Sequence, residues 1–424
     1  MKYSTVWMLA VAALLFFSGV TPARDPQTWI GTWAISPTGL PTLARIRNWT
    51  LPVPTHVAGT FRFRLRVSLG GRQIRLRFSN EYGEQPLTLN AVTVGLAAGN
   101  GLAAGTGPAG HGLDAVSGSL RKVTFAGSDA ITLPGGAPAV SDPIDLPVKA
   151  LGDLVVSVYV RDGMAAFHCD AGENLEDQAV VEGADNTATE HLAVAKCLYV
   201  MRPLVSEVDA LVDRPRKVIV ALGDSITDGV LDPKTGERGW PGALSRRLQG
   251  AGVAVVNAGI GGNRLLQTLP IFGMSALSRL DRDVFAVPGV THIVLLEGIN
   301  DIRMAGPAGV FGDVPMVEPH ALIAAYAQIV ERAHERGIKV IGATLLPFKG
   351  EDIYTAEREN VRAAVNDWIR TTKKLDGVID FDAMMRDPAD PHKLSSQYDR
   401  GDHLHPNPDG YRHMGEAIDL RLFD

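Results

Sequence analysis

Hydrophobic and polar residues alternate with a period of two through much of the first half of the chain, from Trp29 to about Val200. Apolar side chains alternate with arginine or serine in 61–69 and again in 74–78, as they do in half-buried strands. Two glycines separate these segments, so the pattern predicts a β-hairpin with one apolar and one basic face. No amphipathic helix pattern appears, and we predict an all-β sandwich, jelly-roll-like, over residues 24–210. Its further strands are expected at 87–96, 122–125 and 154–160.

The basic face of this predicted hairpin is made of arginines, and it has two interpretations. It could bind an acidic polysaccharide or a phosphate-bearing surface. It could instead be a solvated strand face, or form salt bridges to the second half of the chain. We favour the solvated or interdomain interpretation, because outward strand positions are usually charged. The residues concerned are Arg62, Arg64, Arg66, Arg72, Arg75 and Arg77.

The hydrophobic pattern changes near residue 210. Short apolar runs are then separated by segments of helical periodicity, which is typical of repeated βαβ units. The clearest helical segment is 319–336, and Gly337 follows it as a stop signal. Residues 211–424 are therefore predicted to form an α/β domain with a parallel sheet and helices on both faces. The expected strands are 218–222, 253–256, 292–296, 340–346 and 378–381.

The first 23 residues have the pattern of a signal peptide: Lys2 near the start, an apolar run over 6–17, and small residues before a cleavage site after Ala23. The run is shorter than the roughly 20 residues that cross a bilayer, so no membrane span is expected after cleavage. A secreted or periplasmic location follows as an expectation. In an oxidising compartment Cys169 and Cys197 can form a disulfide; the alternative is two buried free thiols.

Composition narrows the class of function without identifying it. Hydrophobic residues make up 46% and charged residues 21% of the chain, as in soluble globular proteins. The formal net charge of −6 gives no reason to expect a nucleic-acid partner.

Three segments with candidate chemistry come directly after predicted strands, where ligands of parallel sheets bind. Ser225 follows the first strand, and a serine there could be a nucleophile or a helix N-cap. The glycine-rich turn 257–263 follows the second and could present a bare N–H to an oxyanion or cradle a phosphate. Asn300 follows the third, as an oxyanion donor or a helix cap.

A fourth segment, Asp402 to Pro406, lies near the carboxyl terminus. Residues three apart face one another on a helical turn, so Asp402 can accept a hydrogen bond from one ring nitrogen of His405 and leave the other as a base. His403 is expected to point elsewhere. The competing interpretation is a zinc site made by His403, His405 and Asp402, but Ser225 and Asn300 are poor ligands for zinc.

Taken together and in this order, the four segments resemble the SGNH hydrolases, the family of GDSL-type esterases and lipases. The residues that match are Gly223-Asp224-Ser225, Gly262 in the glycine-rich turn, Gly298-x-Asn300-Asp301 and Asp402-x-x-His405-Pro406. Ile226 stands where the family name has leucine.

This resemblance implies a flavodoxin-like three-layer α/β/α sandwich and ester hydrolysis without metal or cofactor. Ser225 would be the nucleophile, His405 the base and Asp402 its orienting carboxylate. The oxyanion would be held by the N–H groups of Ser225 and Gly262 and by the Asn300 side chain.

A signal peptide followed by a β-domain and such a hydrolase domain resembles the acetylxylan-esterase-like branch of the family. The expected substrate is a short acyl ester, such as an O-acetyl group on a small carbohydrate or polysaccharide. The alternatives are a broad-specificity lipase or arylesterase, and a non-catalytic carbohydrate-binding surface protein. Trp240 could be a sugar platform, but a buried tryptophan at a helix start is the favoured interpretation.

Overall fold

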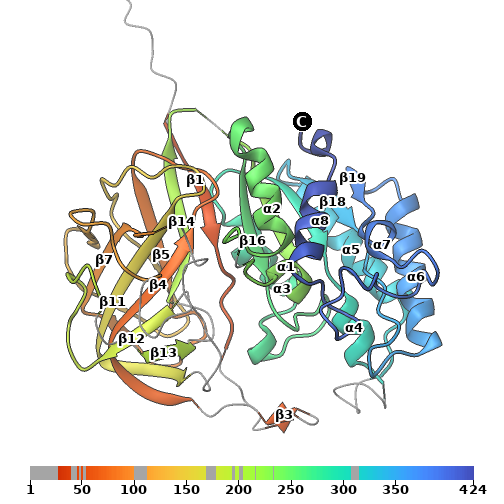
Figure 1. The fold of residues 1–424 in the computed structure, drawn as a ribbon, viewed down its shortest axis with the longest axis horizontal. Coiled ribbons are helices and arrows are strands. Elements are labelled where there is room, and N and C mark those ends of the chain that lie inside the picture. Colours follow the sequence, from red (N-terminus) through yellow and green to blue (C-terminus); the bar gives the residue numbers. More distant parts are fainter. Residues whose placement is uncertain are drawn as a thin grey trace, which may run out of the picture.

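The computed structural model describes residues 27–39, 45–46, 49–50, 54–99, 112–168, 178–192, 196–199, 204–214, 216–232, 234–306 and 315–424. The predicted signal peptide and Cys169, and with it the predicted disulfide, lie outside these residues. Among the described residues, no helix has both the length and the apolar character required to span a bilayer. A β-rich half and an α/β half lie side by side (Figure 1).

The β-rich half consists of antiparallel sheets, as the period-two pattern predicted. One sheet has the order β1-β14-β5-β10, built from Thr28–Ala34, Val205–Val212, Ile74–Ser79 and Pro138–Val140. The other has the order β13-β12-β4-β11-β7-β8, built from Lys196–Tyr199, Gln178–Glu182, Thr55–Arg66, Asp153–His168, Ala91–Leu96 and Arg121–Lys122. The β-rich half also contains two separate two-stranded sheets, β2 (Arg45–Ile46) with β3 (Trp49–Thr50) and β6 (Leu87–Leu89) with β9 (Ile131–Leu133).

The predicted hairpin of β4 with β5 is wrong. β4 pairs with β11 and β12, whereas β5 pairs with β14 and β10 in the other sheet. The apolar side chains of the two strands, including Phe61 and Leu76, meet in one buried core cluster. The two glycines therefore lie where the chain passes from one sheet to the other, and the strands contact through their apolar faces.

The solvated interpretation of the arginine face is wrong for Arg62, which is fully buried. Its Nε donates to Ser157 Oγ at 2.7 Å, and its Nη atoms donate to the carbonyls of Leu113, Thr189 and Glu190. Burial lowers the pKa of Arg62 to about 10. Loop segments far away in the sequence cover this side of β4, which strand periodicity alone does not reveal.

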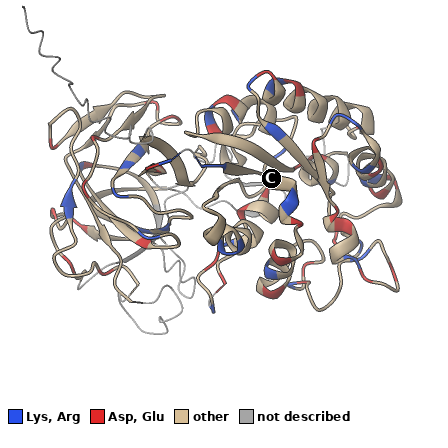
Figure 2. Cartoon of the chain, turned by 90° about the horizontal axis from the view of Figure 1, so that it is seen from above, with Lys and Arg blue, Asp and Glu red and all other residues tan. Residues whose placement is uncertain are grey.

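Arg66 does contact the α/β half, but through a hydrogen bond to a carbonyl and not through the salt bridge that the interdomain interpretation expected. Its Nε lies 2.7 Å from Asp153 Oδ1, and its Nη1 donates to the carbonyl of Thr235 in the α/β half at 2.8 Å. The remaining arginines of the set bind partners within the β-rich half, and Arg75 also stacks on Trp29 at 4.1 Å. Basic and acidic residues are interspersed over both halves (Figure 2).

Replacing the buried arginine tests its structural role. We expect Arg62→Met to lower the free energy of unfolding by about 3 kcal/mol, because buried carbonyls lose their charged donor and no new partner replaces it. Urea denaturation followed by circular dichroism measures this. Arg161→Met on β11 is the matched control, since Arg161 is exposed. An unfolding free energy within about 0.5 kcal/mol of the wild type for Arg62→Met would contradict the assignment.

The α/β half contains a five-stranded parallel sheet of order β16-β15-β17-β18-β19. In chain order this is 2-1-3-4-5, the flavodoxin-like arrangement that the sequence resemblance implied. The strands are β15 (Val218–Gly223), β16 (Ala254–Gly259), β17 (Val290–Leu296), β18 (Lys339–Ala343) and β19 (Gly377–Ile379), each overlapping a predicted apolar run.

Helices cover both faces of this sheet. Strand order reverses direction at β15, so right-handed crossovers place the helices on opposite faces. α2 packs on α8, and α5 packs on α6 (Figure 1). The α-helices are α1 (Ser225–Asp228), α2 (Gly239–Leu248), α3 (Ala276–Leu280), α4 (Ile299–Met304), α5 (Pro319–His334), α6 (Ala356–Thr371), α7 (Phe381–Met385) and α8 (Pro408–Ala417). Shorter turns are 3₁₀ at Gln249–Ala251, Pro270–Phe272 and Leu420–Phe423, and π-helical at Asp281–Phe285.

The β-rich half covers the edge strand β16 of the parallel sheet. The Val255 N–H donates to Ser68 Oγ at 3.1 Å, and the Gly31 N–H donates to the Pro288 carbonyl at 2.8 Å. Ile30 of β1 belongs to the core cluster of the α/β half. The bond to Ser68 occupies one N–H of β16, and β1 packs beside this strand, so the β-rich half covers an edge that would otherwise be open to another chain. They also place the residues after β1 beside the carboxyl ends of β15 and β16.

Candidate active site

Ser225 lies at the point where β15 ends and α1 begins. The N-cap of α1 is Asp224, whose Oδ1 accepts a hydrogen bond from the Ile226 N–H at 2.8 Å. Ser225 therefore does not serve as the cap. Its Oγ lies 2.8 Å from Nε2 of His405, within hydrogen-bond distance.

His405 and Asp402 meet in a bend that precedes α8. Nδ1 of His405 lies 2.7 Å from Oδ2 of Asp402, and the other carboxylate oxygen accepts the N–H groups of Leu404 and His405 at 3.1 and 2.8 Å. The expectation of a helical turn here is wrong, because His403 between them has a left-handed φ of 59°. His403 points elsewhere, as predicted, with Nδ1 2.7 Å from Asp399 Oδ2.

The Asp402 carboxylate stays ionised. Partial burial opposes its charge, but the hydrogen bonds from the His405 ring and from the backbone N–H groups hold the pKa of Asp402 well below its usual range. A charged carboxylate at this position fixes the ring of His405 and favours a proton on Nδ1, which leaves Nε2 facing Ser225 as an acceptor.

The glycine-rich turn after β16 presents Gly262 with a φ of 72°. A Cβ at this position would lie 2.5 Å from Cδ1 of Phe272, so only glycine fits between the turn and the aromatic ring. Within the part of the chain that the structure describes, neither the Gly262 N–H nor the Ser225 N–H donates to a protein acceptor. Both groups are thus available to bind an oxygen atom of a ligand.

Asn300 is buried in the first turn of α4, and its amide is held at both ends. Nδ2 donates to the Asn263 carbonyl at 3.0 Å, and Oδ1 accepts from Nη1 of Arg303 at 3.0 Å. Arg303 is in turn paired with Glu351 at 2.5 Å. These partners fix which end of the amide is nitrogen and use one of its two N–H bonds, so the second N–H is left for a ligand.

Comparison with known proteins assigns this part of the chain to a family. The sequence model of the GDSL-like lipase/acylhydrolase family matches residues 221–413. These residues form a GDSL-like lipase/acylhydrolase domain. The match confirms the family recognised from the sequence and the prediction of a serine ester hydrolase. No curated protein matches the chain.

Several solved structures are similar to this GDSL domain. A GDSL-like lipase from Bacteroides thetaiotaomicron is 21% identical, with 50% of this chain and 90% of the other covered and a TM-score of 0.37. An acetylxylan esterase from Geobacillus stearothermophilus is 20% identical, with 49% and 93% covered and a TM-score of 0.37. A protein described as lipolytic and of the G-D-S-L family, from Desulfitobacterium hafniense, is 25% identical, with 47% and 95% covered and a TM-score of 0.35.

Behind the candidate site of the GDSL domain lies a group of buried acids that the sequence did not single out as a group. Burial raises the pKa of Asp224 to about 7 and that of Asp301 to about 6, and it raises the pKa of Glu297 well above its usual range. Asp301 accepts the N–H groups of Leu265 and Leu266 at 2.7 and 2.9 Å. These carboxyls bind backbone N–H groups of the segments that follow β15, β16 and β17, and in the described part of the chain none of them bonds to the side chain of Ser225 or His405.

Some residues of this surrounding network were missed. Asn263 belongs to the glycine-rich turn 257–263 that the sequence singled out, so its position could have indicated a role beside the site. Glu297 directly precedes the motif Gly298-x-Asn300-Asp301 and Arg303 follows it by two positions, but neither belongs to it. Arg279 lies in a segment without a motif, and only the fold brings it to the strand ends.

Trp240 is not a sugar platform. Its side chain is fully buried in the first turn of α2 and lies against Phe381, with ring centroids 5.5 Å apart. The favoured interpretation of a buried tryptophan at a helix start is confirmed.

Proposed function

We propose that this protein hydrolyses carboxylic esters through a triad of Ser225, His405 and Asp402 and a covalent acyl-enzyme. One observation carries the proposal: Ser225 Oγ lies 2.8 Å from His405 Nε2, and His405 Nδ1 lies 2.7 Å from Asp402 Oδ2. A nucleophile, a base and a carboxylate in one hydrogen-bonded line are the parts that acyl transfer requires.

In the acylation step, His405 Nε2 takes the Ser225 hydroxyl proton while Oγ attacks the ester carbonyl carbon. The carbonyl π electrons move onto oxygen and form a tetrahedral oxyanion. When the oxyanion collapses, the bond to the alcohol oxygen breaks, and the imidazolium gives its proton to the leaving alkoxide. Water then repeats the sequence on the acyl-enzyme, releasing the carboxylic acid and restoring Ser225.

The developing oxyanion is bound by the N–H groups of Ser225 and Gly262 and by the second N–H of Asn300. All three donors belong to segments that follow adjacent strands of one sheet, so they are positioned before the substrate arrives. Preorganised donors of this kind stabilise charge in the transition state at little reorganisation cost.

Labelling with a fluorophosphonate tests the proposal directly. We expect one adduct per chain, located on Ser225 by peptide mass spectrometry. A chain that takes up no label would contradict the proposal and favour a non-catalytic carbohydrate-binding protein. A label on another serine would contradict the assignment of Ser225 as the nucleophile.

We further propose that the acyl group is short and that the alcohol is a carbohydrate. In support, the predicted signal peptide, the β-rich half and the GDSL domain follow one another in the order of the acetylxylan-esterase-like branch that the sequence resembles. The Phe272 ring next to Gly262 bounds one side of the predicted oxyanion turn. The test compares acetate release from acetylated xylan, pectin and chitin with the hydrolysis of nitrophenyl esters of rising chain length. Highest kcat/KM for long-chain nitrophenyl esters would instead favour a broad lipase or arylesterase.

Removal of the Asn300 side chain, one of the three proposed oxyanion donors, should reduce turnover without abolishing it. We expect Asn300→Ala to lower kcat by about 100- to 1000-fold, as loss of a single preorganised donor does elsewhere. Hydrolysis of p-nitrophenyl acetate, normalised by active-site titration, measures the effect. Asn366→Ala is the matched control, because Asn366 is equally buried but bonds only to the backbone of Leu345. Asn366→Ala is expected to lose stability and keep its kcat; an Asn300→Ala enzyme with most of its kcat would show that the amide has no such role.

A further inference from the structure

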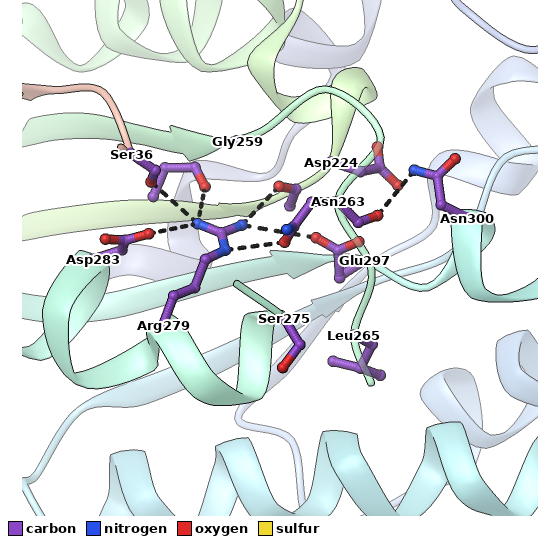
Figure 3. A network of polar contacts seen from close by, with 12 residues as sticks. Ser36, Asp224, Gly259, Asn263, Leu265, Ser275, Arg279, Asp283, Glu297 and Asn300 are labelled. Atoms are coloured by element: carbon purple, nitrogen blue, oxygen red, sulfur yellow. Dashed lines mark hydrogen bonds and ion pairs between the residues drawn. The ribbon is translucent and has the colours of Figure 1, made fainter. Parts of the chain in front are cut away.

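Arg279 of α3 is fully buried and lies beneath the carboxyl ends of the central strands (Figure 3). Its Nη2 donates to the carbonyl of Gly223, the last residue of β15, at 2.9 Å. Its Nη1 donates to the carbonyl of Ala258 in β16 at 2.6 Å. One guanidinium thus bonds the ends of both strands that lead into the nucleophile turn and the glycine-rich turn.

The same guanidinium holds the turn that contains Gly262. Nε donates to Oδ1 of Asn263 at 3.0 Å, and the Asn263 amide nitrogen donates to the carbonyls of Phe272 and Met274 at 2.6 and 2.8 Å. The Asn263 main-chain carbonyl accepts from Nδ2 of Asn300 at 3.0 Å. Asn263 therefore links Arg279 to the residues on both sides of the predicted oxyanion site.

The Arg279 guanidinium is itself held by two carboxylates and by a serine from the β-rich half. Nη1 lies 3.1 Å from Oδ2 of Asp283 and 3.1 Å from Oγ of Ser36, which follows β1. Nη2 lies 3.8 Å from Oε2 of Glu297, at the end of β17. Figure 3 shows Ser36, Asp283 and Glu297 around the guanidinium. The segment after β1 thus contributes directly to the support of the site.

We infer that Arg279 is a positioning residue for ester hydrolysis, which holds Ser225, Gly262 and Asn300 in one geometry through three strand ends and Asn263. The inference rests on the proposed function. The Arg279 guanidinium bonds five oxygen atoms through three nitrogens, whereas a lysine has three donors on a single nitrogen and cannot keep all of these bonds. Since a displacement of about 1 Å at a reacting group can cost about 100-fold in rate, loosening this fork should slow the chemistry rather than weaken binding.

Arg279→Lys tests the inference in the full chain. Hydrolysis of p-nitrophenyl acetate is measured with competent sites counted by titration with a fluorophosphonate. We expect kcat per competent site to fall about 10- to 100-fold with KM changed less than about threefold. Ser36→Ala, which removes one contact of the fork, is expected to lower kcat per site by about two- to fivefold.

Arg362→Lys is the matched control, because Arg362 is also buried but bonds Glu359, Asp382 and the Leu345 carbonyl. A merely structural role for Arg279 predicts fewer competent sites and an unchanged kcat per site, as we expect for Arg362→Lys. That result for Arg279→Lys would overturn the inference.

If Arg279→Lys does not fold, Asn263→Ala replaces it, since it cuts the link between the guanidinium and the oxyanion turn. A loss of at least about 10-fold in kcat per site supports the inference, and an unchanged value overturns it. A wild-type chain that neither turns over esters nor accepts the label would overturn the proposed function and the inference with it. A labelled, active wild type with a normal Arg279→Lys overturns the inference alone.

Discussion

Ser225→Ala is expected to lower kcat for ester hydrolysis by about 10⁴- to 10⁶-fold, the largest effect of any single substitution considered. Without the hydroxyl, no acyl-enzyme forms. His405 can then act only as a base for the direct attack of water on the bound ester. The residual rate comes from the oxyanion donors and from binding. Ser225 Oγ bonds only to the His405 ring among its described side-chain partners, so the substitution should leave the fold intact.

The measurement is hydrolysis of p-nitrophenyl acetate together with fluorophosphonate labelling and a thermal melt. Ser245→Ala serves as the control, because Ser245 is a buried serine of α2 whose hydroxyl has no hydrogen-bond partner among the residues that the structure describes. We expect the control to keep both turnover and label. If Ser225→Ala retained more than about 1% of wild-type kcat at an unchanged melting temperature, another nucleophile would have to be sought.

Local pattern was sufficient to place the strands of the α/β half. Each predicted apolar run overlaps a strand of the parallel sheet, and the helix predicted at 319–336 is α5. Buried parallel strands are continuous apolar runs, and their order follows from short right-handed connections. Fold class was therefore predictable from residues that lie close together in the sequence.

Local pattern was not sufficient to choose strand partners in the β-rich half. A period of two shows that β4 and β5 each have an apolar face, but it is the same for a hairpin and for two strands facing each other across a core. Likewise, alternation made Arg62 look solvent-facing, whereas the carbonyls that surround it come from residues more than 50 positions away. Burial of both faces of a strand depends on which loops fold over it.

The candidate site divides in the same way. Ser225, Asn300 and His405 follow or precede regular elements in recognisable motifs, and the structure places Ser225 and His405 in contact. Arg279, which bonds Asn263, lies in a segment without a motif, and Arg303, which bonds Asn300, follows a motif without belonging to it. Reacting groups are restricted in residue type by their chemistry, whereas many residues could support them, so the reacting groups left the clearest signal.

Asp402→Asn is expected to lower kcat by about 10³- to 10⁴-fold while leaving the bend before α8 folded. The amide oxygen of asparagine can still accept the N–H groups of Leu404 and His405. Its NH₂ group, however, can donate to Nδ1 of His405, which moves the ring proton to Nε2 and removes the acceptor that Ser225 needs. It also supplies no charge to stabilise the imidazolium of the transition state.

The pH dependence of kcat/KM in the wild type tests whether Asp402 stays ionised during catalysis. Hydrogen bonds from His405, acting against partial burial, keep the pKa of Asp402 well below its usual range, so this carboxylate does not titrate between about pH 4 and pH 8. Protonation of Asp402 should therefore cause no fall in kcat/KM over this range, and any acid limb of log kcat/KM should have a limiting slope no steeper than one. A slope of two would show that Asp402 titrates in the same range.

Asp399→Asn is the matched control for Asp402→Asn. Asp399 holds His403 through a 2.7 Å contact to Nδ1 and caps the N–H groups of Gly401 and His403, as Asp402 does for its own neighbours. Both substitutions replace an aspartate by asparagine, and the two positions are three residues apart. Only Asp402, however, pairs with the imidazole that contacts Ser225. We expect Asp399→Asn to keep kcat within about twofold. Equal losses in the two variants would mean that the bend, rather than the charge on Asp402, sets the rate.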